Sequence, residues 1–261
     1  MLNFYINSLY FVLYSMLGWL SEVIYCSIPR KKFINRGFLN GPYCPVYGFG
    51  ALLVIHFLWP FYPYPLLVFL LGIIVTSLLE YITSFLLEKL FHAHWWDYSQ
   101  HHFNIHGRVC LLNSTLFGLL CLILVYGIHP FLTKGIFNIP STFLPLIVMG
   151  FNIILCVDIV VTLYTITSLK DRVHSISELN TTLKEKLYLL ENKLSSLEEK
   201  HLLSEGQRNL RCAEFITYLE NEMNKKVAIK NILHDRLLDA FPSFHFIHLE
   251  EYISKLRDRL K

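Results

Sequence analysis

Charged side chains are scarce in this sequence, and they are unevenly distributed. Only 16% of the 261 residues are charged, whereas 54% are hydrophobic, and the mean hydropathy is +0.43. That balance is too apolar for a soluble chain whose surface must be hydrated. Residues 1–169 contain 12 charged side chains, and the remaining 92 positions contain the other 31. We therefore expect lipid around the first part of the chain and water around the second.

Motifs for several kinds of chemistry are also missing. The chain has no Gly-x-x-x-x-Gly-Lys-Ser/Thr motif, so it has no P-loop to hold ATP, and it has no nucleophile elbow, dinucleotide fingerprint or kinase signature. We therefore expect no enzyme activity and no cofactor. The net charge of +3 provides no strongly basic domain for nucleic acid. The six cysteines include no Cys-x-x-Cys pair, which favours reduced, buried thiols.

Five apolar segments approach or reach the roughly 20 residues that a helix needs to cross a bilayer. They are residues 4–28, 42–59, 65–87, 109–132 and 143–169. The second is short, and its approach from Asn40 to Pro45 is rich in Gly and Pro, which is typical of a re-entrant or cavity-lining segment. The sequence therefore predicts an all-α integral membrane protein with a five-helix transmembrane domain over residues 1–169.

The positions of Lys and Arg predict how these helices are oriented. Cytoplasmic loops are enriched in both residues. Here they cluster after the first segment, around the third loop and at the start of the tail: Arg30, Lys31, Lys32, Arg36, Lys89, Arg108, Lys170 and Arg172. We therefore expect a multi-pass protein with its N-terminus outside the cell and its C-terminus in the cytoplasm.

Three acids interrupt the apolar segments: Glu22, Glu80 and Asp158. Each costs several kcal/mol in lipid unless it is neutralised, paired or in contact with water. One interpretation is a polar cavity for a substrate or a coupling ion, open to the cytoplasm. The other is that each acid bonds to a neighbouring Ser, Thr, Tyr or Asn and helps the helices associate.

The third loop, residues 92–108, contains five of the twelve histidines. Imidazoles and a carboxylate at that density are able to bind a transition metal, although the spacing matches no specific metal motif. The loop's Trp and Tyr content is equally typical of an interfacial belt. Contact with a substrate or a partner is the third interpretation, and we predict no metal site.

The tail shows a heptad pattern over residues 170–205, with apolar positions at intervals of three and four. Its seam contains Val173, Asn180, Leu183, Leu187, Leu190, Leu194 and Leu197. Leu at d positions with a single Asn at an a position favours a parallel two-stranded coiled coil, and hence a homodimer. A single helix with a solvated face, or a hairpin with the later helix, is the alternative. Residues 206–261 are predicted to form a cytoplasmic helical tail.

Several motifs together carry a family resemblance. They are the run Arg36-Gly-Phe-Leu-Asn-Gly-Pro-Tyr-Cys-Pro-Val-Tyr-Gly48, Glu80 with Thr83 and Glu88, and Trp96-Asp97-Tyr98-Ser99 followed by Asn104, Gly107, Arg108, Cys110 and Leu111. The chain resembles the bacterial family labelled putative ABC-transporter type IV across its membrane part, with a weaker match at Ala240-Phe241-Pro242. It departs at Ser84, where the family usually has Gly, and at His102-Phe103, where a Pro commonly precedes the Asn.

This resemblance implies a permease-like subunit in the bacterial cell membrane that takes energy from a separate ATPase subunit. The three acids would line its substrate or ion cavity. Its cytoplasmic mouth would consist of Arg36, Asn40, Trp96, Asp97, Tyr98, Asn104 and Arg108. The alternatives are a membrane-anchored sensor or scaffold that signals through a dimeric tail, and a membrane enzyme that acts on lipid through Asp97 and the histidines.

Overall fold

The computed structural model of the chain describes residues 2–199 and 204–258. It divides into two compact units. Unit 1 consists of Met1–Thr165 and Arg236–Phe244, and unit 2 consists of Ile166–Asp235 and His245–Lys261. The predicted coiled-coil segment therefore falls within unit 2, although its residues 200–203 lie outside the described residues.

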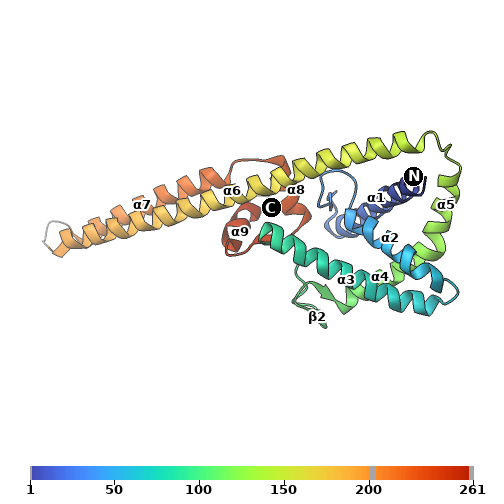
Figure 1. Ribbon diagram of the computed structural model, residues 1–261. Coiled ribbons are helices and arrows are strands. Elements are labelled where there is room, and N and C mark those ends of the chain that lie inside the picture. The colour runs from blue at the N-terminus through green and yellow to red at the C-terminus, as the bar shows by residue number, and fades with distance from the viewer. Residues whose placement is uncertain (1, 200–203, 259–261) are drawn as a thin grey trace. The chain divides into compact units, whose positions relative to one another are not determined.

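Helices make up most of unit 1 (Figure 1). In chain order they are α1 (Leu2–Arg30), α2 (Pro45–Leu58), the 3-10 turn η1 (Trp59–Phe61), α3 (Pro65–Phe91), α4 (Leu111–Ile123), the π turn η2 (Leu124–Ile128), α5 (His129–Phe137) and the part of α6 (Leu144–Glu199) up to Thr165. Pro45 and Pro65 begin their helices, where the absent N–H of proline costs no hydrogen bond. The π turn lies just before Pro130, whose ring cannot fit against the carbonyl four residues earlier in a regular helix.

Two apolar clusters among the described residues contribute to the core of unit 1, and α2 takes part in both. One cluster joins α1, α2, α5 and the start of α6, and the other joins α2, α3, α4 and η2. Glycines let α1 and α2 approach closely. A Cβ at Gly18 would lie 2.2 Å from Tyr47 Cγ, and one at Gly48 would lie 2.3 Å from Ser15 Oγ. Small residues at such crossings are a general device of helix packing in membranes.

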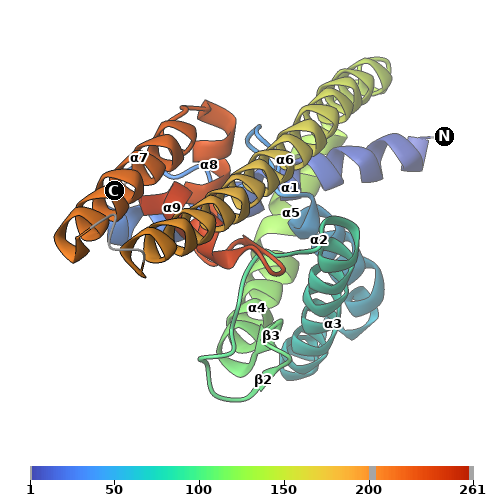
Figure 2. The same cartoon turned by 90° about the vertical axis from the view of Figure 1, so that its left-hand side faces the viewer.

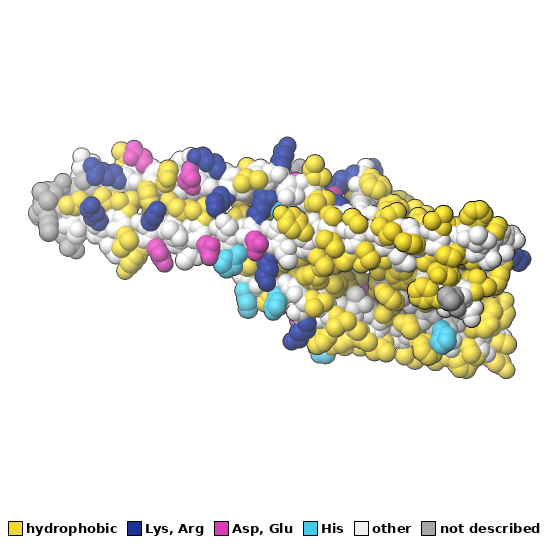
Figure 3. Space-filling model, turned by 45° about the horizontal axis from the view of Figure 1, so that its top comes forward, with side chains coloured by type: hydrophobic (Ala, Val, Ile, Leu, Met, Phe, Trp, Pro, Cys, Tyr) yellow, Lys and Arg dark blue, Asp and Glu magenta, His cyan; other side chains and the backbone are white. Residues whose placement is uncertain are grey.

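In the part of the chain that the structure describes, four helical stretches are long and apolar enough to cross a membrane: Leu2–Arg30, Pro65–Phe91, Leu111–Phe137 and Leu144–Leu197. The most apolar windows of these helices are only 11% to 28% buried within the chain, so their apolar side chains face outward. Hydrophobic side chains accordingly gather over unit 1 in Figure 3, whereas charged side chains gather over unit 2. The fold is therefore that of a helical membrane protein, as the sequence predicts.

The second predicted segment is the exception. Its helical part, Pro45–Phe61, is shorter than the four long stretches. The chain between α1 and α2 is irregular, as expected from the glycine and prolines between Asn40 and Pro45. The five-span topology therefore remains a prediction.

Short strands lie beside the helices. β2 (Asn104–Ile105) and β3 (Val109–Cys110) form an antiparallel hairpin in the loop between α3 and α4, with Asn104 opposite Cys110 (Figure 2). Its turn contains Gly107, which has a φ of +67°. The other strands are β1 (Ala93–His94) in unit 1 and β4 (His245–Phe246) in unit 2.

Unit 2 is built on the second half of α6. Its other helices are α7 (Glu205–Val227), the first turn of α8 (Ile232–Ala240) and α9 (Glu250–Asp258). A capping box begins α7, since the Ser204 hydroxyl accepts from the Gln207 N–H and the Gln207 side chain accepts from the Ser204 N–H.

The heptad seam of α6 packs against other parts of the same chain. Arg172 donates to the carbonyls of Val227 and Ile229, and Asn180 Nδ2 donates to Tyr252 Oη at 2.9 Å. Val173 and Leu194 are buried. This is the hairpin alternative of the sequence analysis. The parallel homodimer stays a prediction, because a second copy would have to replace Tyr252 as the partner of Asn180.

Candidate functional site

Polar side chains gather at one end of the unit 1 helices, next to the loops that carry the basic residues. Glu22 of α1 accepts a hydrogen bond from Tyr47 Oη of α2 at 2.5 Å. Its other oxygen lies 3.6 Å from Arg36 Nε, and both side chains are about one quarter exposed or less. Glu22 therefore joins two helices and the first loop.

Asp158 of α6 holds the start of the irregular approach to α2. Its carboxylate accepts the backbone N–H of Asn40 at 3.0 Å and that of Gly41 at 2.6 Å. Asn40 Nδ2 also donates to Asp158 at 3.1 Å and to Thr162 at 3.0 Å. An ionised carboxylate here satisfies backbone groups that lipid would leave unpaired.

Glu80 of α3 is the least satisfied of the three acids. Its Oε1 accepts a hydrogen bond from Tyr98 Oη at 3.3 Å. Its Oε2 is buried and has no hydrogen-bond partner among the described residues. Such groups are rare in folded proteins, because each one loses its hydration without compensation.

The electrostatic surroundings of Tyr98 involve both Glu80 and Glu22. Burial, together with the nearby carboxylates of Glu80 and Glu22, raises the pKa of Tyr98. Tyr47 donates to Glu22 and Tyr98 donates to Glu80, and we name these two pairs the acid–tyrosine group. Chemically, two carboxyl groups beside two phenols are able to bind a proton or a cation and to exchange hydrogen-bond partners.

Arg108 forms a second ionic cluster. Its Nη2 lies 2.5 Å from Glu88 Oε2, its Nη1 donates to Tyr81 Oη at 3.2 Å, and Trp96 Nε1 donates to its carbonyl at 3.0 Å. His94 Nδ1 lies 3.6 Å from the same Glu88 oxygen. The Glu88 carboxylate and the Tyr81 hydroxyl raise the pKa of Arg108, so it stays charged.

The remaining predicted mouth residues shape their own loop. Asp97 accepts hydrogen bonds from the Ser99 N–H and Ser99 Oγ, and Asn104 accepts one from the Gly107 N–H. The Tyr98 N–H donates to the Gly107 carbonyl at 2.8 Å. A Cβ at Gly107 would lie 2.7 Å from Asp97 Oδ1, and the positive φ there also favours glycine. Asp97 and Asn104 thus position Tyr98 rather than face a cavity.

The structure brings the predicted residues together in pairs and not in one ring. Glu22 meets Arg36, Asp158 meets Asn40, and Glu80 meets Tyr98. Sequence reasoning missed Tyr47 as the partner of Glu22, although Tyr47 lies within the quoted motif from Arg36 to Gly48. It also did not assign Glu88 to the site.

Histidines of the third loop take part in separate contacts. Besides the His94–Glu88 pair, His106 Nδ1 lies 3.2 Å from Tyr81 Oη. Within residues 2–199 and 204–258, no group of three or more His, Cys, Asp or Glu side chains is arranged to hold a metal ion.

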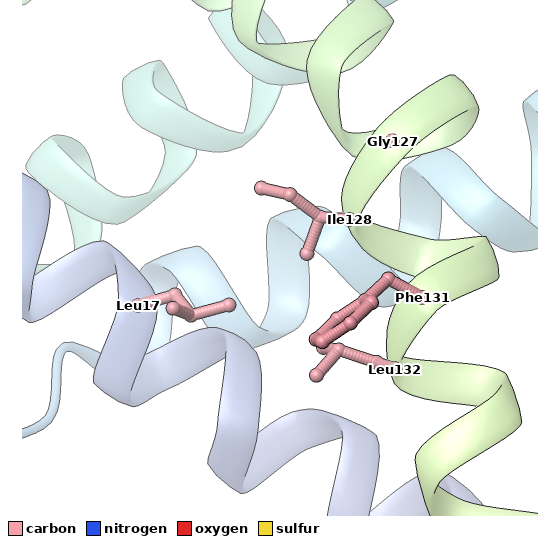
Figure 4. A pocket seen from close by; sticks show the side chains of 5 residues that line it. All are labelled: Leu17, Gly127, Ile128, Phe131 and Leu132. Atoms are coloured by element: carbon pink, nitrogen blue, oxygen red, sulfur yellow. The ribbon is translucent and has the colours of Figure 1, made fainter.

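A pocket of about 350 Å³ has an apolar lining (Figure 4). The lining comes from α1, η2 and α5: Leu17, Gly127, Ile128, Phe131 and Leu132. Glu22, Glu80 and Asp158 do not line this pocket; they contact loops and tyrosines instead.

Comparison with known proteins gives one match. Residues 9–163, which include the acids and all the predicted mouth residues, match the model of a family described as putative ABC-transporter type IV. No curated protein and no solved structure matches the chain. The match covers more than half of the sequence and agrees with the apolar helices of a membrane protein related to transport. The chain therefore belongs to the putative ABC-transporter type IV family.

Proposed function

We propose that the protein is a permease-like membrane subunit without catalytic activity of its own, in which the acid–tyrosine group binds a substrate cation or a coupling proton. The observation that carries the proposal is Glu80, whose Oε2 is buried without a hydrogen bond inside an apolar helical unit. A carboxyl group with only a structural role would gain by pairing both oxygens.

The energetic argument concerns burial of charge. An ionised carboxyl group in a membrane costs several kcal/mol unless it is paired or hydrated. Asp158 avoids this cost through its contacts with Asn40 and Gly41. Among the described residues, Glu80 has only the long hydrogen bond from Tyr98, so binding a proton or a cation would stabilise it most. We therefore expect Glu80 to be the residue that binds and releases the transported or coupling ion.

The position of the group along the helices supports an opening towards the cytoplasm. Glu22 precedes Arg30 by eight residues and Glu80 precedes Lys89 by nine. These separations correspond to about 12–14 Å at the helical rise. Basic loops are typical of the cytoplasmic side, which supports the proposal that this end of the helices faces the cell interior. The ion pairs of Arg36 and Arg108 would form the mouth, because pairs near water exchange partners at small cost.

Five spans remain our proposal for the topology. Pro45–Phe61 would cover about 25 Å at the helical rise, which approaches the roughly 30 Å of the hydrocarbon core. With α2 crossing, the chain passes the membrane five times, with its N-terminus outside and the tail in the cytoplasm. Energy would come from a separate ATPase subunit, since the chain has no P-loop.

The test uses a strain that lacks the gene. Small solutes in the cells and the medium are compared after complementation with the wild type, with Glu80→Gln, and with Glu178→Gln as a control. Glu178 lies in unit 2, where its side chain is 69% exposed. We expect the wild type and the control to restore a solute distribution that Glu80→Gln does not. Full restoration by a folded Glu80→Gln protein would contradict the proposal.

Exposed apolar residues on unit 2 favour a second candidate function, that of a membrane-anchored sensor or scaffold. Leu189, Tyr188 and Leu210 are more than half exposed on the helices of that unit. Exposed apolar side chains on a charged tail would provide a partner with an apolar contact surface if they form one patch. In this case a deletion strain would lack a signalling response and show an unchanged solute distribution.

A further inference from the structure

One short segment near the C-terminus packs as part of unit 1, although the chain on both sides of it belongs to unit 2. The segment is Arg236–Phe244, and we name it the latch segment. Its partner is the first loop, from Asn35 to Gly41, which lies next to Glu22 and Asp158.

Arg236 binds the backbone of that loop. Its Nη1 donates to the carbonyl of Gly37 at 2.9 Å, and its Nη2 donates to that of Phe38 at 3.3 Å. A further contact reaches the Asn35 carbonyl at 3.5 Å. A single guanidinium therefore bonds to carbonyls of a loop that has no helical hydrogen bonds of its own.

Arg36 makes the reverse connection, from the loop to the latch segment. It donates to the Ala240 carbonyl, and its guanidinium lies 4.7 Å from the centre of the Phe241 ring. The same side chain pairs with Glu22. Removal of the latch segment would thus leave Arg36 with fewer partners and change the surroundings of an acid in α1.

Aromatic rings complete the docking site. Trp95 lies 4.9 Å from Phe38, 5.3 Å from Phe241 and 4.9 Å from Phe244, measured between ring centres. Trp95 and Phe244 are at most 3% exposed. At the edge, Lys32 pairs with Asp239 at 2.9 Å. Two loops of unit 1 therefore enclose a peptide from the far end of the chain.

We propose that the latch segment is an internal ligand that holds the Asn35–Gly41 loop closed over the Glu22 and Asp158 contacts, and that its release opens the cytoplasmic mouth. Residues 235 and 245, on either side of the latch segment, belong to unit 2. Because the chain is continuous, unit 2 is able to control the release of the latch segment. A partner that rearranges unit 2 therefore pulls on both ends of the segment. What the loop regulates rests on the proposed function, whereas the closure itself does not.

Cys44 provides a native reporter of the loop. It is 6% exposed, its N–H donates to the Ser15 carbonyl at 2.9 Å, and its Sγ lies 3.9 Å from the Arg36 carbonyl. A buried thiol reacts with maleimide only when its surroundings open, so the labelling rate follows the population of the open loop.

The experiment measures maleimide labelling of full-length protein in detergent, with Cys44 as the only cysteine. Arg236→Ala and Phe241→Ala are compared with the wild type, with Arg236→Lys, and with Arg211→Ala, which changes an exposed arginine of α7. We expect Arg236→Ala and Phe241→Ala to label about tenfold faster or more, since hydrogen bonds to charged groups are among the stronger ones. The labelling rate of Arg236→Lys should lie between the rates of these two variants and that of the wild type. The labelling rate of Arg211→Ala should match that of the wild type.

A second reporter separates loop opening from loss of the fold. Cys121 is 3% exposed in the core of unit 1 and, as the only cysteine, should stay protected in the same variants. Wild-type labelling of Cys44 in Arg236→Ala and Phe241→Ala would overturn the proposal, and so would equal acceleration at Cys121. Because labelling requires no transport, fast labelling combined with an unaffected Glu80→Gln strain would reject the proposed function alone.

Discussion

Asp158 and Glu80 are both acids within apolar helices, yet their surroundings give them different roles. Asp158 accepts two backbone N–H groups and a side-chain amide, which makes it part of the fold. Glu80 has one hydrogen bond and an oxygen that is buried without one. The first acid is thus a structural anion, and the second is the candidate for binding and release.

Replacement of Asp158 should therefore destabilise the loop from Asn35 to Gly41 rather than abolish the binding of an ion. Asp158→Ala leaves the N–H groups of Asn40 and Gly41 without their acceptor. We expect the free energy of unfolding to fall by about 2 kcal/mol. Thr162→Val, one turn further along α6, removes the hydrogen bond that Thr162 accepts from Asn40 and the one that it donates to Asp158, and it leaves both backbone N–H groups with their acceptor, so it should cost about 1 kcal/mol. Unfolding in SDS titrations measures both, and equal losses would contradict the role given to Asp158.

At the scale of elements, the close approach of α1 and α2 depends on Gly18 and Gly48. Gly48→Ala places a methyl group against Ser15 Oγ and Phe11, with the nearest atom at 2.3 Å. Overpacking of this kind costs about 1–3 kcal/mol. The matched change Gly150→Ala meets nothing within 4 Å, so it should be neutral or stabilise α6 by up to about 1 kcal/mol.

Thermal stability in detergent measures this difference, followed as the temperature at which the gel-filtration peak is lost. We expect a lower temperature for Gly48→Ala only. If Gly48→Ala and Gly150→Ala behave alike, the α1–α2 contact is not as close as described.

The seam of α6 provides the second element-scale prediction. Because Asn180 Nδ2 donates to Tyr252 Oη, Asn180→Ala and Tyr252→Phe should be coupled by about 1 kcal/mol in a double-mutant cycle. Asn180→Cys should give no disulfide-linked dimer in oxidised membranes while α9 stays packed. Ready crosslinking would instead support the parallel homodimer that the heptad pattern predicts.

Across the whole molecule, the sequence predicts the apolar helices better than it predicts which segments pack against them. Four long helices follow directly from windows of low charge, because a membrane selects for composition over about 20 residues. The heptad pattern marks apolar positions along α6, of which Val173, Leu183 and Leu194 are buried. The pattern does not specify what covers them, since either a second copy or other helices of the same chain would bury the same side chains.

The candidate site shows the same limit. The motifs that contain Arg36, Asn40, Tyr98 and Arg108 lie in short stretches of the sequence, yet the partners of these residues come from distant positions. Asp158 binds Asn40 across 118 residues, and Arg236 binds Gly37 across 199 residues. Neither hydrophobic periodicity nor the spacing of local motifs encodes such contacts. In the sequence, only the family resemblance at Ala240-Phe241-Pro242 marks the latch segment.

We propose above that this chain is the membrane subunit of a transport system whose energy comes from another protein. The decisive measurement is affinity purification of the full-length chain from its native membranes, with identification of bound subunits and measurement of ATP hydrolysis. The account predicts a stoichiometric partner with a P-loop and ATPase activity in the purified complex. Recovery of a regulator or a cell-envelope enzyme, with no P-loop protein, would contradict it.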